Sequence, residues 1–351
     1  MNKLKLIFLI TITAFFASCS EDPINEFDQP DNTETGIEEP ATAVESTVEV
    51  ANPKPGTVSE VYYAGHKIPV ESFGSDYIFQ GDIRIPGDMV NQHPVKLVYE
   101  MGETPPANKS VGRTSARWPD NTVYYAIEGS LDGKERVYDA ISHWEAKTNL
   151  DFVERTSQSN YIYFETGSGC SSYIGMIGGR QSITLSPYCS TGNTIHEIGH
   201  AIGLWHEQSR VDRGQFITIN YENIESGMDH NFYTYEYQGF DGAELTTNLD
   251  FNSIMMYGSY SFSANGQPTI VRKDGSTFRG QRDGLSSGDI TGVNKMYPSG
   301  NTNISEITEY INGRYYTIDG LTVLRYFDRW FFAGRYGTGE VVLIDGTWYW
   351  K

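Results

Sequence analysis

The 351-residue sequence is poor in cysteine, in basic residues and in long apolar runs. Lys and Arg together number 26 against 45 Asp and Glu, which gives a formal net charge of −19. Because no basic stripe is available to displace counterions from phosphate, nucleic acid is not expected as a partner. The apolar run at residues 6–17 is too short to cross a bilayer, so no transmembrane span is expected either.

The first residues instead resemble an export signal. Two lysines precede the apolar run, and we assign residues 1–19 to a signal peptide. The segment 16–19, Phe-Ala-Ser-Cys, resembles a bacterial lipobox in which Cys19 is acylated, and the acidic residues that follow resemble the tag of surface-exposed lipoproteins. Phe16 departs from the usual leucine, so plain cleavage by a general signal peptidase is the alternative. Contact with a membrane is expected only through this lipid anchor.

Residues 20–50 contain ten acidic residues and no lysine or arginine, together with several Pro, Thr and Asn. This composition predicts a disordered tether. Much of the net charge therefore belongs to a tail and says little about any binding cleft.

Of the three cysteines, Cys170 and Cys189 lie outside the signal region. An oxidising compartment would pair them, and the closed loop of 18 residues would contribute about 3 kcal/mol. Two free thiols are the alternative.

The most informative segment is 196–206, His-Glu-Ile-Gly-His-Ala-Ile-Gly-Leu-Trp-His. On a helix, His196 and His200 share one face, so both imidazoles can reach one metal ion. Gly203 can take the left-handed conformation that ends a helix, which lets His206 supply a third nitrogen.

Three protein ligands leave one coordination position open, as a catalytic zinc requires for activating water. Glu197 would then accept a proton from the zinc-bound water. The competing interpretation is a capping box of Thr194 and Glu197, but a helix capped by Ser190, Thr191 or Asn193 presents the histidines more firmly.

The spacing H-E-x-x-H-x-x-G-x-x-H is the metzincin pattern. The continuation at 206–213, His-Glu-Gln-Ser-Arg-Val-Asp-Arg, and the segment 253–257, Ser-Ile-Met-Met-Tyr, resemble the astacin family of zinc endopeptidases and its Met-turn. The segment 169–189 also resembles the disulfide loop of that family, whose other common disulfide has no cysteines here. The resemblance implies one catalytic Zn²⁺ and protein or peptide substrates.

The resemblance also implies roles for three further residues. Met255 forms an apolar floor below the zinc, and Tyr257 is a displaceable fifth ligand that stabilises the oxyanion during turnover. Glu207 pairs with the amino terminus of the mature enzyme. Without the family pattern, Met255 and Tyr257 are ordinary core residues.

Upstream, residues 79–82, Phe-Gln-Gly-Asp, are similar to the F-x-G-D propeptide motif of that family. Asp82 would occupy the open position on zinc and keep the precursor latent; the alternative is a turn aspartate after glycine. We assign residues 51–113 to the inhibitory propeptide, with Asp82 in an extended segment between strands at 76–79 and 82–85. An activating protease would find Lys109, Arg113 and Arg117 in the segment 107–117.

Residues 114–298 form the expected catalytic domain, and residues 299–351 a β appendage with twelve aromatic residues and turns at Asp319-Gly320 and Asp345-Gly346. The fold class is α+β, an astacin-like domain with a mixed sheet and helices in one half and a loop-rich half at 214–280. The sequence predicts strands at 122–127, 151–153, 161–164 and 182–185, the last an edge strand for substrate, and helices at 136–148 and 286–296.

The sequence thus predicts a secreted or surface-attached, latent zinc metalloendopeptidase that becomes extracellular after activation. A noncatalytic zinc-containing surface lipoprotein that binds glycan or matrix through its aromatic C-terminal segment is the alternative. Four basic residues after the Met-turn either favour acidic substrate side chains or are solvated surface charges; they are Arg272, Lys273, Arg279 and Arg282.

Overall fold

A computed structural model describes residues 48–63, 66–93, 98–102, 117–238, 240, 242–299, 314–318, 321–326, 329–334, 337–344 and 347–351. The predicted signal peptide with Cys19, most of the predicted tether, and the candidate cleavage sites Lys109 and Arg113 lie outside these residues. In the described part, no helix has the length and apolar character needed to cross a membrane.

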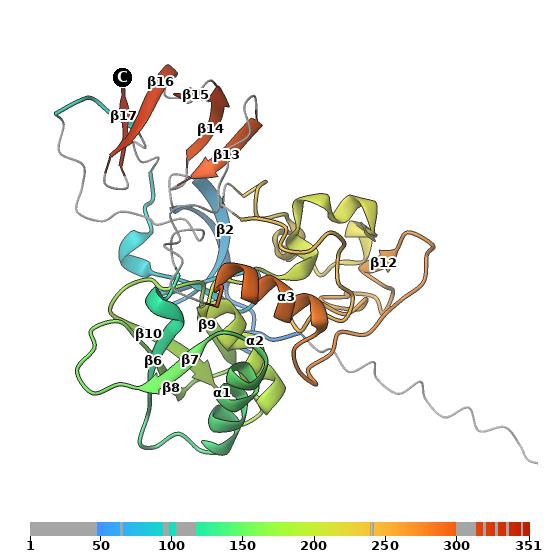
Figure 1. Cartoon of the computed structure of the whole chain (residues 1–351). Helices are drawn as coiled ribbons and strands as arrows, with labels where there is room; N and C mark the ends of the chain where they lie inside the picture. Colours follow the sequence, from blue (N-terminus) through green and yellow to red (C-terminus); the bar gives the residue numbers. More distant parts are fainter. Residues whose placement is uncertain are drawn as a thin grey trace, which may run out of the picture. The chain divides into compact units, whose positions relative to one another are not determined.

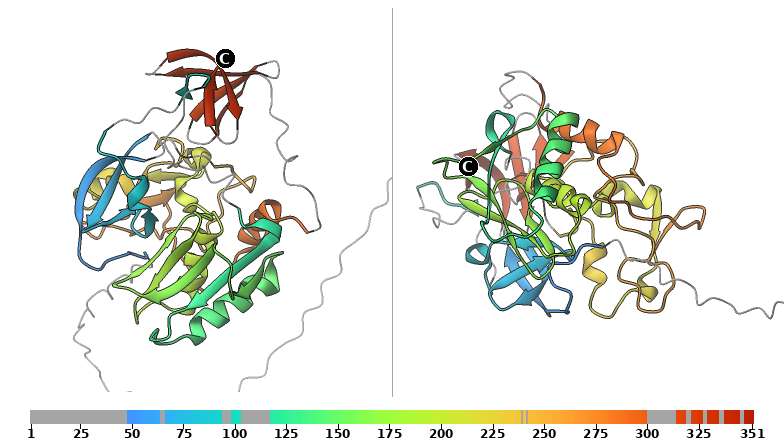
Figure 2. Two further views of the ribbon diagram at one scale, coloured as in Figure 1. Left: turned by 90° about the vertical axis from the view of Figure 1, so that its left-hand side faces the viewer. Right: turned by 90° about the horizontal axis from the view of Figure 1, so that it is seen from below.

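Nine strands form one mixed sheet in the order β1-β2-β3-β4-β9-β10-β8-β6-β7 (Figure 1). Their bounds are β1 Thr57–Tyr63, β2 His66–Phe73, β3 Asp76–Phe79, β4 Ile83–Ile85, β6 Thr122–Ile127, β7 Asp151–Glu154, β8 Tyr161–Thr166, β9 Cys170–Tyr173 and β10 Arg180–Leu185. Strands β6, β7, β8 and β10 pair in parallel, whereas β9 is antiparallel to β10. The antiparallel strands β1 to β4 join this sheet because β4 pairs in parallel with β9. Figure 2 shows these blue strands beside the green ones.

Two helices pack beside each other against this sheet, α1 (Glu135–Lys147) and α2 (Thr191–Ala201). The predicted core face of α1 is confirmed, since Val137, Ile141 and Trp144 are buried. Helix α2 begins after Ser190, whose hydroxyl accepts from the Asn193 backbone N–H while the Asn193 side chain accepts from the Ser190 N–H. The cap is therefore Ser190, and Glu197 is not used in capping.

The second half of the catalytic region is irregular, as predicted for residues 214–280. Its regular elements are short 3₁₀ turns and the antiparallel pair β11 (Ile217–Ile219) and β12 (Ile270–Arg272). They surround an apolar cluster that includes Phe232, Met256 and Tyr257. Helix α3 (Ser287–Met296) follows within the predicted range 286–296, and its cap is Ser286.

The aromatic C-terminal segment forms a sheet, as predicted. Its strands are β13 Arg314–Ile318, β14 Leu321–Tyr326, β15 Arg329–Gly334, β16 Gly337–Ile344 and β17 Thr347–Trp350, with β5 Val98–Tyr99 paired to β17. The pairs β13-β14 and β16-β17 are antiparallel, and the predicted turn residues Asp319-Gly320 and Asp345-Gly346 lie outside the described part. Phe332 and Trp348 are buried in the core of this sheet, so part of its aromatic content serves packing.

Three expectations, about the edge strand, the position of Asp82 and the end of the tether, were wrong. Residues 182–185 do not form an edge strand, since β10 lies between β8 and β9. Between β10 and β4 lies β9, a short Cys-Ser-Ser-Tyr segment without the apolar alternation that marks strands in sequence. Asp82 lies in a tight turn between β3 and β4, and the end of the predicted tether, Val48 to Val50, is ordered, with Glu49 only 2% exposed.

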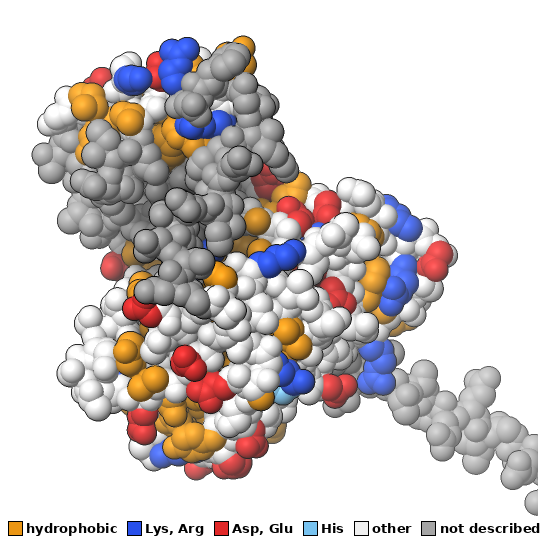
Figure 3. Space-filling model, in the orientation of Figure 1, with side chains coloured by type: hydrophobic (Ala, Val, Ile, Leu, Met, Phe, Trp, Pro, Cys, Tyr) orange, Lys and Arg blue, Asp and Glu red, His pale blue; other side chains and the backbone are white. Residues whose placement is uncertain are grey.

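Charged side chains of both signs are interspersed over the face shown in Figure 3. Lys273 and Arg279 are exposed, in agreement with solvated surface charge, and Arg272 lies over the ring of Phe251. Arg282 differs, because its side chain is only 9% exposed. For Arg282, the interpretation as a solvated surface charge was therefore wrong.

The predicted disulfide between Cys170 and Cys189 is present and ties the start of β9 to the entrance of α2. Replacing both cysteines by alanine should lower the free energy of unfolding by about 3 kcal/mol, because the unfolded chain regains the entropy of an 18-residue loop. Urea denaturation of the chain from residue 20 onward measures this, with the unsubstituted chain of the same length as the reference. An unchanged unfolding midpoint would contradict the stabilising role.

Candidate metal centre

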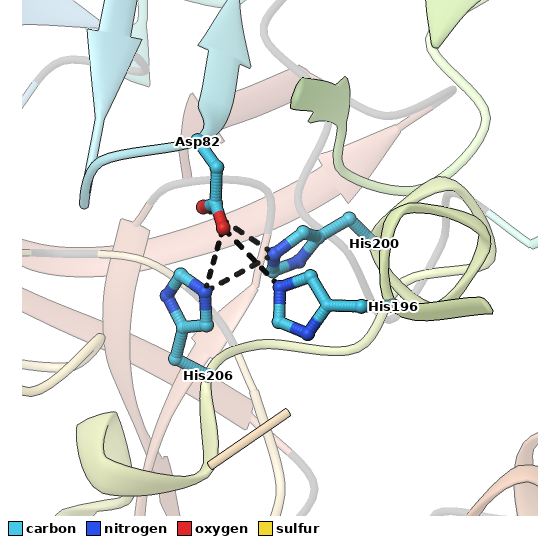
Figure 4. A group of neighbouring side chains, drawn as sticks. All are labelled: Asp82, His196, His200 and His206. Carbon is cyan, nitrogen blue, oxygen red and sulfur yellow. Dashed lines mark hydrogen bonds and ion pairs between the residues drawn. The ribbon is translucent and has the colours of Figure 1, made fainter. Parts of the chain in front are cut away.

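Three histidines converge on one point from helix α2 and the loop that follows it (Figure 4). His196 and His200 lie on α2 and are fully buried. Gly203, with φ of 112°, reverses the chain just after the helix, a backbone conformation that favours glycine. This turn brings His206, 1% exposed, against the other two rings.

The Nδ1 atom of each ring faces an oxygen acceptor. His196 Nδ1 lies 2.8 Å from the Ile254 carbonyl, and His200 Nδ1 lies 2.8 Å from the Leu204 carbonyl. His206 Nδ1 lies 3.3 Å from Gln80 Oε1, whose amide nitrogen donates elsewhere. A carbonyl can only accept, so these Nδ1 atoms carry hydrogen and the Nε2 atoms present lone pairs.

The Nε2 lone pairs face one another and a carboxylate. Asp82 Oδ2 lies 3.2 Å from His196 Nε2 and 3.3 Å from His206 Nε2, and Asp82 Oδ1 lies 3.5 Å from His200 Nε2. His200 Nε2 and His206 Nε2 are 3.3 Å apart. Four acceptors without hydrogen atoms between them repel unless a cation lies at their centre. Tetrahedral zinc, with ligands at about 2.0–2.1 Å, separates its ligand atoms by about 3.3–3.4 Å, so the group fits one zinc ion.

The electrostatics of the four residues also fit a divalent cation. Burial lowers the pKa of His206 to about 4 and lowers the pKa of His200 as well. Burial alone would raise the pKa of Asp82, but the neighbouring His206 and His200 hold it well below its usual range. Neutral imidazoles and an ionised carboxylate are the forms that ligate metal.

Glu197 follows His196 on α2, and its side chain is fully buried. Neither carboxylate oxygen has a hydrogen-bond partner among the described residues. Burial, then the charges of Asp82 and Glu49, raise its pKa well above the ordinary value. An unpartnered buried carboxyl is costly to maintain and is typical of a functional acid or base.

Met255 and Tyr257 both reach the site. Met255 lies directly beneath α2, since a Cβ on Gly199 would come within 2.7 Å of its Sδ. The Tyr257 ring centroid is 4.7 Å from that of His206, and its hydroxyl donates to the Gln80 carbonyl at 2.8 Å. The tyrosine hydroxyl is thus held by the backbone of the turn that carries Asp82.

Asp289 supports the site, a role that the sequence did not reveal. This buried carboxylate accepts from Ser253 Oγ at 2.6 Å and from the Ile254 N–H at 2.9 Å. Since the Ile254 carbonyl orients His196, Asp289 connects the cap of α3 to a histidine. Its one sequence signal is its position three residues after Ser286, where capping residues occur.

The turn that carries Asp82 is fixed against β9. Gln80 and Gly81 have φ of 47° and 83°, and a Cβ on Gly81 would lie 3.1 Å from Phe262. The Asp82 carbonyl accepts from the Ser172 N–H at 3.1 Å. The glycine of the motif therefore permits both the turn and the close approach.

Glu49 is a second carboxylate in the cleft. It accepts a paired hydrogen bond from Arg282 Nε and Nη2, and Asn193 Nδ2 donates to it at 2.8 Å. Burial would raise its pKa, but Arg282 lowers it to about 2. In the sequence, Glu49 is one of the ten acids of the predicted tether. Its apolar neighbours in Val48-Glu49-Val50 are the signal that distinguishes it from the other acids.

Glu207 lies at a separate cavity, which Arg117, Asp250 and Met296 also line. Its carboxylate accepts from the Asp250 N–H at 2.8 Å, and Arg210 Nη1 lies 3.4 Å away. Burial raises the pKa of Glu207 to about 7.

Residues 110–298 match the family described as Astacin, a family of peptidases. The chain is 35% identical over 266 residues to Protein SpAN of Strongylocentrotus purpuratus, covering 72% of this chain and 42% of that protein. It is 34% identical over 222 residues to Zinc metalloproteinase nas-4 of Caenorhabditis elegans, covering 60% of this chain and 68% of that protein.

Among solved structures, High choriolytic enzyme 1, a hatching enzyme zinc-protease from Oryzias latipes, is similar with a TM-score of 0.48 and 33% identity. The match covers 52% of this chain and 95% of that one. The chain spans 42% of the length of Protein SpAN and of Blastula protease 10 from Paracentrotus lividus.

Replacing His200 by alanine should reduce bound zinc from one ion per chain to a small fraction, because two imidazoles and one carboxylate hold zinc less tightly than the full set. Glu197→Ala is the matched control, since this neighbour on α2 is not a ligand and should leave the zinc content unchanged. Metal analysis of the dialysed precursor measures both. Equal zinc in the His200 variant and the wild type would rule out this centre.

Proposed function

This chain belongs to the astacin family of peptidases, and on that premise we propose that it is a zinc metalloendopeptidase that hydrolyses peptide bonds in proteins. The observation that carries the proposal is the unpartnered Glu197 carboxylate beside three converging Nε2 lone pairs. A site for structural zinc alone has no use for a buried carboxyl kept without partners.

The chain's own residues supply the remaining chemistry. Zinc held by His196, His200 and His206 would contribute the positive charge that polarises water and the substrate carbonyl. Glu197 accepts a proton from the attacking water and returns it to the leaving amine. Tyr257, once its hydroxyl leaves the Gln80 carbonyl, donates a hydrogen bond to the negative charge that develops on the carbonyl oxygen.

The precursor is proposed to be latent because Asp82 takes the position that water needs. Its carboxylate oxygens lie within 3.2–3.5 Å of all three Nε2 atoms. The turn around Gly81 and the pairing of β4 with β9 place the propeptide along the sheet edge where an extended substrate would pair.

Maturation is proposed to cut within residues 107–117, by an activating protease that recognises a basic residue. The new amino terminus would then enter the cavity lined by Glu207, which Arg117 also lines. An ammonium group there would add a second positive charge beside the buried Glu207 carboxylate, which Arg210 already approaches at 3.4 Å.

We also propose that the precursor is a bacterial cell-surface or outer-membrane lipoprotein anchored at Cys19. This rests on the lipobox-like residues alone, since the relatives named above are animal proteins. Anchor and inhibitor would share one segment, so one cleavage would both expose the zinc and release the enzyme.

The alternative, a noncatalytic lipoprotein that binds glycan or matrix through the C-terminal sheet, has weaker support. Phe332 and Trp348 are buried within that sheet, which leaves fewer aromatic faces for a ligand. No observation at the zinc group favours it.

Glu197→Ala should lower casein hydrolysis at least about 100-fold, since the general base is lost while the zinc ligands remain. The test uses residues 20–351 activated with trypsin, with and without 1,10-phenanthroline, and the exposed Glu222→Ala as control. No cleavage by zinc-loaded, fully matured wild type would move the assignment to the binding protein.

Asp82→Ala should give an uncleaved precursor that hydrolyses casein, because nothing then blocks water from the zinc. Asp88→Ala, an exposed aspartate of the same propeptide, is the control and should stay latent. Activity is measured before any protease is added. A stable Asp82 variant with full latency would refute the proposed inhibitory role.

A further inference from the structure

We propose that the C-terminal sheet is a docking surface for the segment around Val98 and Tyr99, and that it holds the N-terminal part of the chain, the residues before the maturation cut, after that cut has been made. This inference rests on the proposed function, in particular on a cut within residues 107–117. It makes the cut necessary but not sufficient for release, because β5 must also leave β17.

The C-terminal sheet combines two distant parts of the chain. Strands β13 to β17 follow one another in sequence, and each pairs antiparallel with the next. Strand β5 is added at the far edge, parallel to β17, with Val98 opposite Trp348 and Tyr99 opposite Tyr349. Figure 2 shows this short blue-green strand against the red strands of the sheet. A cut within residues 107–117 therefore breaks the covalent link between β5 and the sheet that contains it.

The burial of Val98 makes β5 part of the core of this sheet. Val98 is only 3% exposed and belongs to the same apolar cluster as Leu321, Phe332 and Trp348. Val98 and Trp348 lie on one face, since paired residues of neighbouring strands point to the same side. Met101, three residues further on, is 63% exposed, so the buried contact is confined to the strand. The sheet thus loses buried apolar area when β5 leaves.

Departure of β5 would also leave β17 as an exposed edge. Residues 347–350, Thr-Trp-Tyr-Trp, are of the aromatic and β-branched types that favour strands. An uncovered edge of this composition offers its backbone groups to other chains and favours aggregation. Residues 98–99 cover the edge in the manner of peptides that bind by strand addition, where backbone pairing gives affinity and one side-chain contact gives specificity.

The N-terminal part of the chain is attached to the rest at two places. The first is the metal site, where β4 pairs with β9 and Asp82 faces the three histidines. The second is the C-terminal sheet, which holds β5 beyond residues 86–97. After the cut, a segment that leaves one place is still bound at the other, so its local concentration stays high and it binds again. Release requires both contacts to be open at once, which is slower than the opening of either.

The first test asks whether the cut chain stays together. In the chain from residue 20 onward, the recognition site of a sequence-specific protease replaces residues 107–113, so that the cut falls at one place. After complete cutting, both parts should elute in one peak on size-exclusion chromatography. Two parts that elute separately would overturn the proposal without the need for any variant of the sheet.

The second test assigns the retention to β5. The same chain is immobilised through a tag at its amino terminus and cut on the surface, and the release of residues 114–351 is followed as a loss of bound mass. Val98→Asp should release that part about 10- to 100-fold faster, the ratio that corresponds to burial of one apolar side chain. Met101→Asp is the matched control, since it puts the same charge on an exposed position of this segment. Equal release rates for the two variants would contradict a role of β5.

A third measurement separates the loss of β5 from misfolding of the sheet. In the uncut Val98→Asp chain, the backbone amides of residues 347–350 should exchange hydrogen faster, while those of β14 and β15 stay protected. Val98→Thr keeps the branched shape but adds a hydroxyl to the apolar contact, so its exchange and release should be intermediate. Unchanged protection of residues 347–350 in both variants would show that β5 does not cover this edge.

These three readouts do not depend on peptidase activity. A cut chain that stays together but never hydrolyses casein, even after the N-terminal part has been removed, would overturn the proposed function and leave the docking surface in place. A chain that hydrolyses casein but separates at once after the cut would overturn the docking surface alone.

Discussion

The central constraint of this structure is the convergence of hydrogen-bond acceptors with no proton to separate them. Backbone carbonyls at Ile254 and Leu204 fix the hydrogens of two imidazoles on Nδ1, so their Nε2 lone pairs must face the Asp82 carboxylate. Such an arrangement is stable only around a cation. The reversal at Gly203 and the turn at Gly81 are the backbone features that make the convergence possible.

This constraint explains why much of the supporting structure is polar and buried. Asp289 holds the Ile254 peptide and thereby the ring of His196, although it contacts neither the metal group nor Glu197. Met255 supplies an apolar floor beneath α2. Residues that do not ligate the metal thus hold the ligands in place. Their role becomes clear from the structure, which shows the side chains and peptides that they orient.

Two carboxylates from the N-terminal part of the described chain reach the metal site. Asp82 faces the zinc ligands and Glu49 faces Arg282, and between them the backbone pairs with β9 at Val50 and at Asp82. One segment therefore satisfies two groups that are costly to bury alone, the cluster of imidazoles and the guanidinium.

Local sequence patterns were sufficient to predict much of the metal site and several elements of the fold. The histidine spacing, Gly203, the Ser190 and Ser286 caps, the core face of α1 and the Cys170–Cys189 pair all depend on neighbours in sequence or on a very small number of candidates. The edge strand was assigned wrongly because β9 pairs through its backbone, and backbone pairing leaves little trace in side-chain identity.

The sequence by itself determined the metal-binding chemistry, because a helix of known period fixes which side chains share a face. Only the tertiary structure decided what fills the cleft. Glu49 and Arg282 are separated by more than two hundred residues, and each alone is an ordinary charged residue. Their pairing depends on where residues 48–50 cross β9, a long-range contact that no local pattern specifies.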